Sequence, residues 1–451
     1  MQTAQAGSLE PRVVRKIAWR LLPLAILGYI VAYVDRSNIS FAALTMNKDL
    51  GFTPYVYGLG AGIFFIGYLL FEIPSNLIMA RTGARLWIAR ILFTWGIASA
   101  LTAFITGPLS FYGVRFLIGV AEAGFLPGIV LYFTYWFPAR YRARVFAGLY
   151  VAQPVANAVA ALASGAILGM DGFLGLRGWQ WVFLLEALPA LLLALVVLRA
   201  MTDRPAAATW LADDEKAWLE RTLAAEHRAA GSAGDRSWIQ ACLDPRTLAL
   251  TVIWFGTVTA NYGVVFFMPQ ILKGLQASNF MTGVLSAIPY VVGIVGLLLW
   301  GWSSDRLNER RWHLIVACIL CSVGLVGAGW FGASYWAVVA MSVSMIGLFG
   351  TRAVFWAMPA AFLTGTSAAA AFAFINSVSQ IGGYVGPFVV GWIKDGTGSF
   401  ESALYFLAAC SLLSAVVAVF ARRAASGRAE TTQDALPAGP HCTGPMARPT
   451  T

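Results

Sequence analysis

Charged residues are scarce in this chain of 451 residues: Asp, Glu, Lys and Arg make up 12% of it, whereas 59% is hydrophobic. Soluble domains carry about 25% charged residues, so this sequence cannot cover a globule with a polar surface. Apolar runs of roughly 20 residues recur along it, and each is long enough to cross a ~30 Å bilayer core. The composition therefore predicts an all-α polytopic membrane protein.

Cysteine and histidine are also rare, with five and three residues. Cys318 and Cys321 form a C-x-x-C pair, but it lies inside the apolar run ACILCSVG, with no His or carboxylate near it to complete a site. We interpret both as packing residues and expect no metal. His227, His313 and His441 fall in predicted loops or the tail, so a proton-carrying group inside the membrane can only be a carboxylate.

The apolar runs predict twelve spans in two blocks of six. They lie at 17–46, 57–80, 86–106, 109–137, 145–168, 179–200, 247–272, 280–302, 313–333, 335–363, 367–394 and 400–422. Residues 201–246 are charged, contain an amphipathic helical pattern at DDEKAWLERTL, and separate an amino-terminal half (1–200) from a carboxyl-terminal half (247–422). The Pro-, Gly- and Thr-rich segment 423–451 is expected to be a disordered cytoplasmic tail.

The 31 Lys and Arg residues are distributed unevenly between the two sides of this predicted bundle. Most lie in the amino terminus, the even-numbered loops and the tail. The other side has four: Lys48, Arg177, Lys273 and Lys394. This bias predicts that both termini are cytoplasmic, in the cell (inner) membrane. The net charge of +10 therefore reflects topology, and the partner it indicates is the lipid bilayer, not nucleic acid.

Two loops repeat between the halves. In GWSSDRLNERR, after the eighth span, Asp305 and Arg306 fit the pattern G-x3-D-R-x-x-x-R, and Arg81 in NLIMARTGAR, after the second span, stands in the same frame. These loops and the six-plus-six layout resemble the major facilitator superfamily, which implies two halves that rock about a midplane site. We interpret the three residues as gating charges that hold one state. Glu72 is interpreted as a gate or structural pair, within reach of Arg140, Arg142 or Arg144.

Charges also remain within the predicted spans, where each costs roughly 2.5–3.5 kcal/mol at a helix centre. They are Asp35, Arg36, Glu72, Arg115, Glu122, Glu186 and Arg352. Arg115 and Glu122 are seven residues apart, about 20° short of two helical turns, so they share one face about 10 Å apart. Asp35 and Arg36 differ by about 100° and can reach different neighbours. No role is assigned to Glu186.

The chemistry of these groups suggests a division of roles. A guanidinium grips a carboxylate with a rigid fork, so Arg36 and Arg115 suit an anionic substrate. A buried carboxyl can take up a proton and lose it again when an anion competes for its Arg partner, so Asp35 and Glu122 are the candidates for proton coupling. The alternative is that Asp35–Arg115 and Arg36–Glu122 are fixed ion pairs that only orient helices.

Longer segments give a more specific resemblance. YVDRSNIS, RFLIGVAEAGFLPGIVLYFTYWFPARYRAR, GWQWVFLLEALPA and INSVSQIGGYVGPFVVGWIKDGTGS resemble the anion:cation symporter family, in particular bacterial tartrate-, sugar-acid- and phthalate-type permeases. The resemblance implies that Asp35 and Glu122 match the family's protonation carboxylates, and that Arg36 and Arg115 match its substrate-binding arginines. It also implies hydroxyl-binding and aromatic contacts at Tyr33, Tyr68, Gln153, Trp356 and Asn376.

The resemblance implies proton-coupled symport of a small organic anion by alternating access, with no enzymatic activity and no cofactor besides protons. We expect a monomer. Ala353 stands where the sugar-acid branch has a hydroxyl residue, and Arg352 adds a third deep cation, so a hydroxy-dicarboxylate such as tartrate is favoured. The alternatives are a sugar acid, an aromatic acid of the phthalate or hydroxyphenylacetate kind stacked by Phe355 and Trp356, and an anion exchanger without net proton movement.

Overall fold

A computed structural model describes residues 2–231, 238–360 and 365–421, which are nearly all helical and contain no strand. The helices are α1 (Gln2–Asp49), α2 (Pro54–Thr82), α3 (Ala84–Leu101), α4 (Pro108–Glu122), α5 (Phe125–Thr134), α6 (Ala139–Ile167), α7 (Gly178–Ala200), α8 (Asp213–Gly231), α9 (Trp238–Cys242), α10 (Pro245–Lys273), α11 (Asn279–Leu307), α12 (Arg311–Phe331), α13 (Tyr335–Phe355), α14 (Ala357–Ala360), α15 (Gly365–Thr397) and α16 (Glu401–Phe420). Within the described residues, eleven spans are long and apolar enough to cross a membrane. The remaining predicted span, 367–394, falls within α15, and the predicted tail 423–451 lies outside the described residues.

Capping residues fix where several spans begin. Thr53 accepts a hydrogen bond from the Val56 N–H at 3.3 Å, and Ser278 accepts one from the Met281 N–H at 3.2 Å. Large apolar side chains on the outer helix faces remain exposed, among them Leu70 (59%) and Leu77 (61%) on α2. A soluble surface would not carry such a density of exposed aliphatic groups, so these faces are the lipid-contacting surface of a multi-pass membrane protein.

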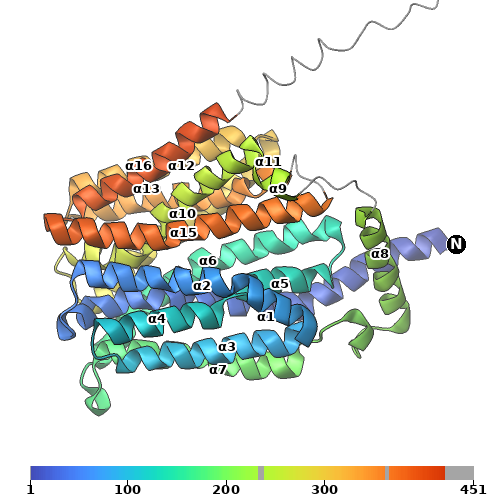
Figure 1. Cartoon of the computed structure of the whole chain (residues 1–451), viewed down its shortest axis with the longest axis horizontal. Helices are drawn as coiled ribbons and strands as arrows, with labels where there is room; N and C mark the ends of the chain where they lie inside the picture. Colours follow the sequence, from blue (N-terminus) through green and yellow to red (C-terminus); the bar gives the residue numbers. More distant parts are fainter. Residues whose placement is uncertain (1, 232–237, 361–364, 422–451) are drawn as a thin grey trace, which may run out of the picture.

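The two halves of the chain form two helical bundles that lie side by side (Figure 1). The first bundle, α1–α7, is drawn in blue to green, and the second, α10–α16, in yellow-green to red. The predicted amphipathic helix of the central segment is α8, which lies near the start of α1. Glu215 of α8 anchors it there, with Lys16 Nζ at 2.8 Å and Arg12 Nη2 at 3.3 Å. Burial raises the pKa of Glu215, but the hydrogen bonds and charges of its neighbours outweigh burial and hold that pKa below its usual value.

The halves are in direct contact at the far end, by which we mean the end that carries the α1–α2 loop, opposite the amino terminus. A Cβ atom on Gly58 of α2 would lie 2.4 Å from the carbonyl oxygen of Pro387 in α15. Gly283 of α11 meets α6 just as closely, because its Cβ would lie 2.4 Å from the Ala161 carbonyl oxygen. Glycine at these positions lets two backbones approach across the interface, as small residues do between membrane helices.

Apolar packing shows the same asymmetry between the two ends. One buried cluster runs from the far part of the first half, including Phe64 and Phe65, into the second half through Phe266 and Tyr290. The buried cluster at the amino-terminal end of the first half is separate and includes Leu21. The structure is therefore a state in which the halves are sealed together at the far end.

The predicted span 109–137 is divided into two helices, α4 and α5, at Gly124, whose φ of 85° lies in the left-handed region that favours glycine. Glu122 stands at this break. The corresponding span of the second half, 335–363, keeps helical backbone angles at Trp356, between α13 and α14, with φ −69° and ψ −15°. These are the fourth helices of the two halves. A discontinuous helix is a feature of transporter binding sites.

Candidate functional site

Arg36 and Glu122 form the most tightly bonded ion pair of the interior. Arg36 Nε donates to Glu122 Oε1 at 2.7 Å, and Nη2 lies 2.6 Å from the same oxygen. Both are buried, with exposures of 8% and 0%. The guanidinium carbon of Arg36 lies 5.1–5.2 Å from the ring centres of Tyr33, Phe64 and Tyr68, which form an aromatic cage around it.

Asp35 and Arg115 are not ion-paired. Asp35 accepts a short hydrogen bond from Ser99 Oγ and one from Asn38 Nδ2 at 3.2 Å. Arg115 is 1% exposed, lies 5.2 Å from the Phe64 ring centre, and has no hydrogen-bond partner for Nε or Nη2 among the described residues. Of the two ion pairs considered from the sequence, the structure therefore contains Arg36–Glu122 alone, and Arg115 keeps donors for another acceptor.

The second half contributes Arg352, whose Nη1 donates to Gln153 Oε1 in a short hydrogen bond across the two halves. Its Nε has no partner in the described part of the chain, and its guanidinium carbon lies 5.8 Å from the Trp254 ring centre. Gln153 is 1% exposed and Arg352 is 8% exposed. A neutral amide leaves the charge of Arg352 uncompensated, so an anion is its natural partner.

Aromatic rings surround the carboxyl-terminal end of α13. Trp356 lies 5.8 Å from Phe372 in a stacked arrangement and 5.3 Å from Trp254 edge-on. Trp254 also stacks on Phe355 at 4.4 Å. These rings make an apolar wall beside Arg352 that can pack against the carbon skeleton of a ligand.

Glu72 and Asn376 meet across the two halves, with Asn376 Nδ2 donating to Glu72 Oε1 at 3.4 Å. Glu72 is 6% exposed, and its Oε2 has no partner among the residues that the structure describes. The residue predicted to gate and the amide predicted to bind substrate are thus neighbours. Asn376 is half-buried and can turn either to this carboxyl or to a ligand.

Arg140 and Arg142, which the sequence predicts to lie near Glu72 of α2, form ion pairs with other residues instead, which corrects that expectation. Arg140 pairs closely with Glu10, and Arg142 Nη2 lies 3.2 Å from Glu226. The side chain of Arg144 lies outside the described residues. These pairs tie the start of α6 to the amino-terminal segment and to α8, on the side of the bundle opposite the far end.

The three predicted gating charges of the repeated loops, Arg81, Asp305 and Arg306, are separated in this state. Asp305 pairs with Arg310 of its own loop, and Arg306 lies over the Trp302 ring at 5.3 Å. Arg81 is exposed and has no ion-pair partner within the described ranges. The structure thus places none of these three residues in a contact between the halves; of the predicted gating residues, Glu72 makes such a contact, with Asn376.

Several residues near the candidate site were not predicted from the sequence. The Tyr262 hydroxyl accepts from Arg36 Nη1 at 3.2 Å, and its neighbour Asn261 is fully buried with no side-chain hydrogen-bond partner among the described residues. The polar pair Asn-Tyr inside the apolar run TVTANYGVVFF was a usable signal. Ser99 and Trp254 gave no such signal in the sequence, because a serine in ASA or a tryptophan in an apolar span is ordinarily a helix-packing residue.

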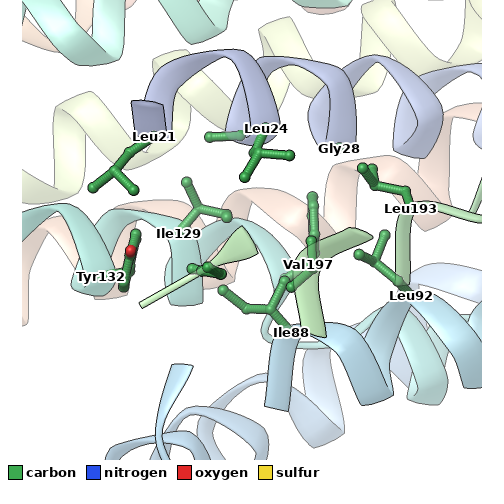
Figure 2. Close-up of a pocket in the computed structure, with 12 residues that line it drawn as sticks. Leu21, Leu24, Gly28, Ile88, Leu92, Ile129, Tyr132, Leu193 and Val197 are labelled. Atoms are coloured by element: carbon green, nitrogen blue, oxygen red, sulfur yellow. The ribbon is translucent and has the colours of Figure 1, made fainter. Parts of the chain in front are cut away.

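An apolar pocket lies elsewhere in the first half, between α1, α3, α5 and α7 (Figure 2). Aliphatic side chains such as Leu21 and Val197 line it, and the Tyr132 hydroxyl at its edge donates to the Thr202 carbonyl at 2.7 Å. It shares no residue with the charged cluster and offers nothing to an anion. The candidate site is therefore the cluster around Arg36, Arg115 and Arg352.

Comparison with known proteins identifies the scaffold. The profile of the Major Facilitator Superfamily matches residues 25–387 and 258–441. The chain is 48% identical, over 93% of its length and 96% of the relative's, to a protein of Agrobacterium vitis named "Putative tartrate transporter". It is 42% identical to a "Quinolone resistance transporter" of Acinetobacter baumannii, covering 90% and 94% of the two chains. The inward open structure of the xylose transporter XylE from E. coli shares the fold, with a TM-score of 0.72, 15% identity, and coverage of 89% and 95%.

Proposed function

The chain belongs to the major facilitator superfamily and is a membrane transporter, not an enzyme, and on that premise we propose that it takes up a small organic carboxylate by proton-coupled symport. Alternating access of the two halves carries the substrate across. The best candidate substrate is a hydroxy-dicarboxylate such as tartrate. We place the protein in the cytoplasmic membrane with both termini in the cytoplasm, acting as a monomer with protons as its coupling ion.

The observation that carries this proposal is the set of buried guanidinium groups with unused donors. Arg115 in the first half and Arg352 in the second each have a nitrogen without a hydrogen-bond partner among the described residues. Burying such groups is costly unless something completes their hydrogen bonding. A substrate carboxylate does so with a bidentate, charge-assisted contact.

The position of Glu122 supports proton coupling. Ionised Glu122 occupies Arg36, which would otherwise be free to bind a substrate carboxylate. A proton on Glu122 removes the ion pair and releases Arg36, so protonation and anion binding favour each other. Asp35, bonded to Ser99 and Asn38 nearby, is the second candidate for a transported proton.

The case for a dicarboxylate rests on arginines in both halves. Arg36 and Arg115 can hold one carboxylate, and Arg352 can hold the other, with the hydroxyls of Tyr33 and Tyr262 available for polar groups between them. The relative named as a tartrate transporter is consistent with this choice.

An aromatic acid is the second candidate, and a specific observation favours it. The rings of Trp254, Trp356 and Phe372 beside Arg352, with Trp356 stacked on Phe372 and edge-on to Trp254, would suit a planar ligand. A relative of similar identity is named "Quinolone resistance transporter".

Uptake into proteoliposomes under an imposed pH gradient tests the proposal. The screen compares tartrate with a sugar acid and with phthalate, each with and without the gradient. We expect tartrate to accumulate above its external concentration when the inside is alkaline. Uptake of tartrate that ignores the gradient would support the exchanger or passive-carrier alternative, and preferred uptake of phthalate would support the aromatic acid.

A further inference from the structure

The start of α1 carries a basic helix face that the proposed transport mechanism does not use. Arg12, Arg15, Lys16 and Trp19 follow one another at steps of three, one and three residues. At 3.6 residues per turn these positions fall within a sector of about 100°, so they share one side of the helix. We call these four residues the basic face.

Burial fixes the direction in which this face points. All four of its side chains are exposed. Val13 and Ile17, on the other side of the helix, are 0% exposed and belong to the buried apolar cluster of the first half. The basic face therefore points away from the core of the bundle.

The basic face forms one wall of a recess next to α8, which lies near the start of α1 (Figure 1). The recess has a volume of about 480 Å³, within the range of roughly 300–1,000 Å³ that small-ligand pockets occupy. Ala212 and Glu215, at the start of α8, line its other wall. It shares no residue with the candidate transport site around Arg36, Arg115 and Arg352.

Acidic neighbours neutralise only part of the basic face. Lys16 Nζ and Arg12 Nη2 both contact Glu215, at 2.8 and 3.3 Å, so one buried carboxylate serves two cations. Asp214 lies 3.8 Å from Arg12, but its side chain is 61% exposed, and an exposed pair of this kind contributes little. Arg15 forms no ion pair with any acid that the structure describes. The recess thus keeps a net positive charge, and Arg15 keeps its donors for a ligand.

The recess lies where α1 enters the membrane. The uncharged apolar run 21–34 begins two residues after Trp19, so the whole basic face lies within about 14 Å of that run along the helix axis. Trp19 is 78% exposed. Tryptophan is enriched at the headgroup level of bilayers, and basic residues that flank a span attract anionic lipids. The position and the charge of the recess therefore match those of a phospholipid headgroup.

We propose that the recess binds the phosphate headgroup of an anionic phospholipid. Arg15 donates to the phosphate, Arg12 and Lys16 add positive charge, and the Trp19 ring lies at the boundary between headgroup and acyl chains. A lipid fits better than a soluble anion, because the basic face borders the membrane-spanning run and presents an exposed tryptophan that a soluble anion does not need. In the proposed topology this lipid belongs to the cytoplasmic leaflet.

Native mass spectrometry of the full chain in detergent tests this site, with phosphatidylglycerol and phosphatidylcholine added at equal concentrations. We expect the wild type to retain phosphatidylglycerol in at least about fivefold preference. Arg15→Gln removes a cation without removing an ion pair of the fold, so its affinity for phosphatidylglycerol should fall about fivefold, the contribution of one basic residue near an anionic surface. Arg221→Gln, on an exposed position of α8 outside the recess, is the matched control and should keep the wild-type affinity.

A photoactivatable phosphatidylglycerol keeps the proposal testable should Arg15→Gln fail to fold. On the wild type, cross-links should map to residues 12–19 and 212–215. Cross-links confined to other parts of the chain, equal retention of the two lipids, or equal losses in Arg15→Gln and Arg221→Gln would overturn the lipid site. Displacement of phosphatidylglycerol by inorganic phosphate, but not by chloride of equal ionic strength, would assign the recess to a soluble anion instead. None of these measurements involves transport, so their outcome is independent of the proposed function.

Discussion

Arg36 of α1 and Arg115 of α4 belong to one candidate site, but they have different surroundings. Arg36 is held by Glu122 and Tyr262, whereas Arg115 keeps two nitrogens without partners among the described residues. Arg115 is therefore the residue most ready to receive a carboxylate, and Arg36 becomes available when Glu122 is protonated.

Arg115→Lys tests the first assignment. A lysine keeps the charge but loses the bidentate fork, so we expect tartrate affinity to fall at least about tenfold, equivalent to about 1.4 kcal/mol. Arg115→Ala should lose more. Equilibrium binding to purified protein measures both, with Arg199→Lys on the exposed face of α7 as control. Wild-type affinity in Arg115→Ala would remove this residue from the site.

Glu122→Gln tests the second assignment, that Arg36 becomes available when Glu122 is protonated. The amide imitates the protonated acid, so it should still bind tartrate and exchange it across the bilayer. It should not concentrate tartrate against a gradient, because no proton leaves it. Counterflow and gradient-driven accumulation, measured on the same vesicles, separate the two activities. Accumulation at the wild-type level would move the coupling role to Asp35.

The sequence was a good guide to which charged side chains lie buried inside the bundle and a poor guide to their partners. Charges inside apolar spans stand out whatever the fold, so Arg36, Arg115 and Glu122 could be found by inspection. Whether Asp35 faces Arg115 or Ser99 depends on helix rotation of a few tens of degrees, which hydropathy does not encode. The contact between Glu72 and Asn376 depends on the docking of two halves and has no local signal.

At the scale of helices, hydropathy located the spans and the amphipathic α8, but it missed the interruption of the fourth helix of the first half. The break at Gly124 comes from one glycine in an apolar run, where glycine is common. The crossings of α2 with α15 and of α6 with α11 were likewise invisible, because a glycine that touches another backbone looks like any other. Such crossings are the elements that seal the far end.

Gly283→Ala should therefore weaken the contact between the two halves at the far end. The added Cβ would lie 2.4 Å from the Ala161 carbonyl oxygen, which is backbone and cannot move aside. We expect the population to shift toward states open at the far end. Labelling of Ser286→Cys, a buried position one turn away, should rise several-fold with an impermeant thiol reagent applied to whole cells.

The background for this measurement has its native cysteines replaced. Gly148→Ala is the control, since its Cβ would meet nothing within 4 Å. Equal labelling in the two glycine variants would contradict the assignment of the α6–α11 crossing as a seal.

For the whole molecule, substrate binding and rocking are linked if the ligand spans the halves. Arg36 and Arg115 belong to the first bundle and Arg352 to the second, where it is bonded across the interface to Gln153. A diacid held at both ends draws the bundles together, and protonation of Glu122 controls when the first end can be held.

Arg352→Gln tests this clamp by comparing tartrate with its monoamide. If Arg352 holds the second carboxylate, tartrate should lose at least about tenfold in affinity, and the monoamide, which has no second charge, should change by less than about twofold. Equal losses for the two ligands would discard the clamp and leave Arg352 as a structural partner of Gln153.

Proton movement driven by the substrate alone tests the central claim most directly. Vesicles holding a pH-sensitive dye are given external tartrate with no imposed pH gradient and with the membrane potential clamped. Symport predicts that the interior acidifies as tartrate enters, that a protonophore abolishes the signal, and that Glu122→Gln vesicles show none. Tartrate entry in the wild type without any acidification would contradict the account.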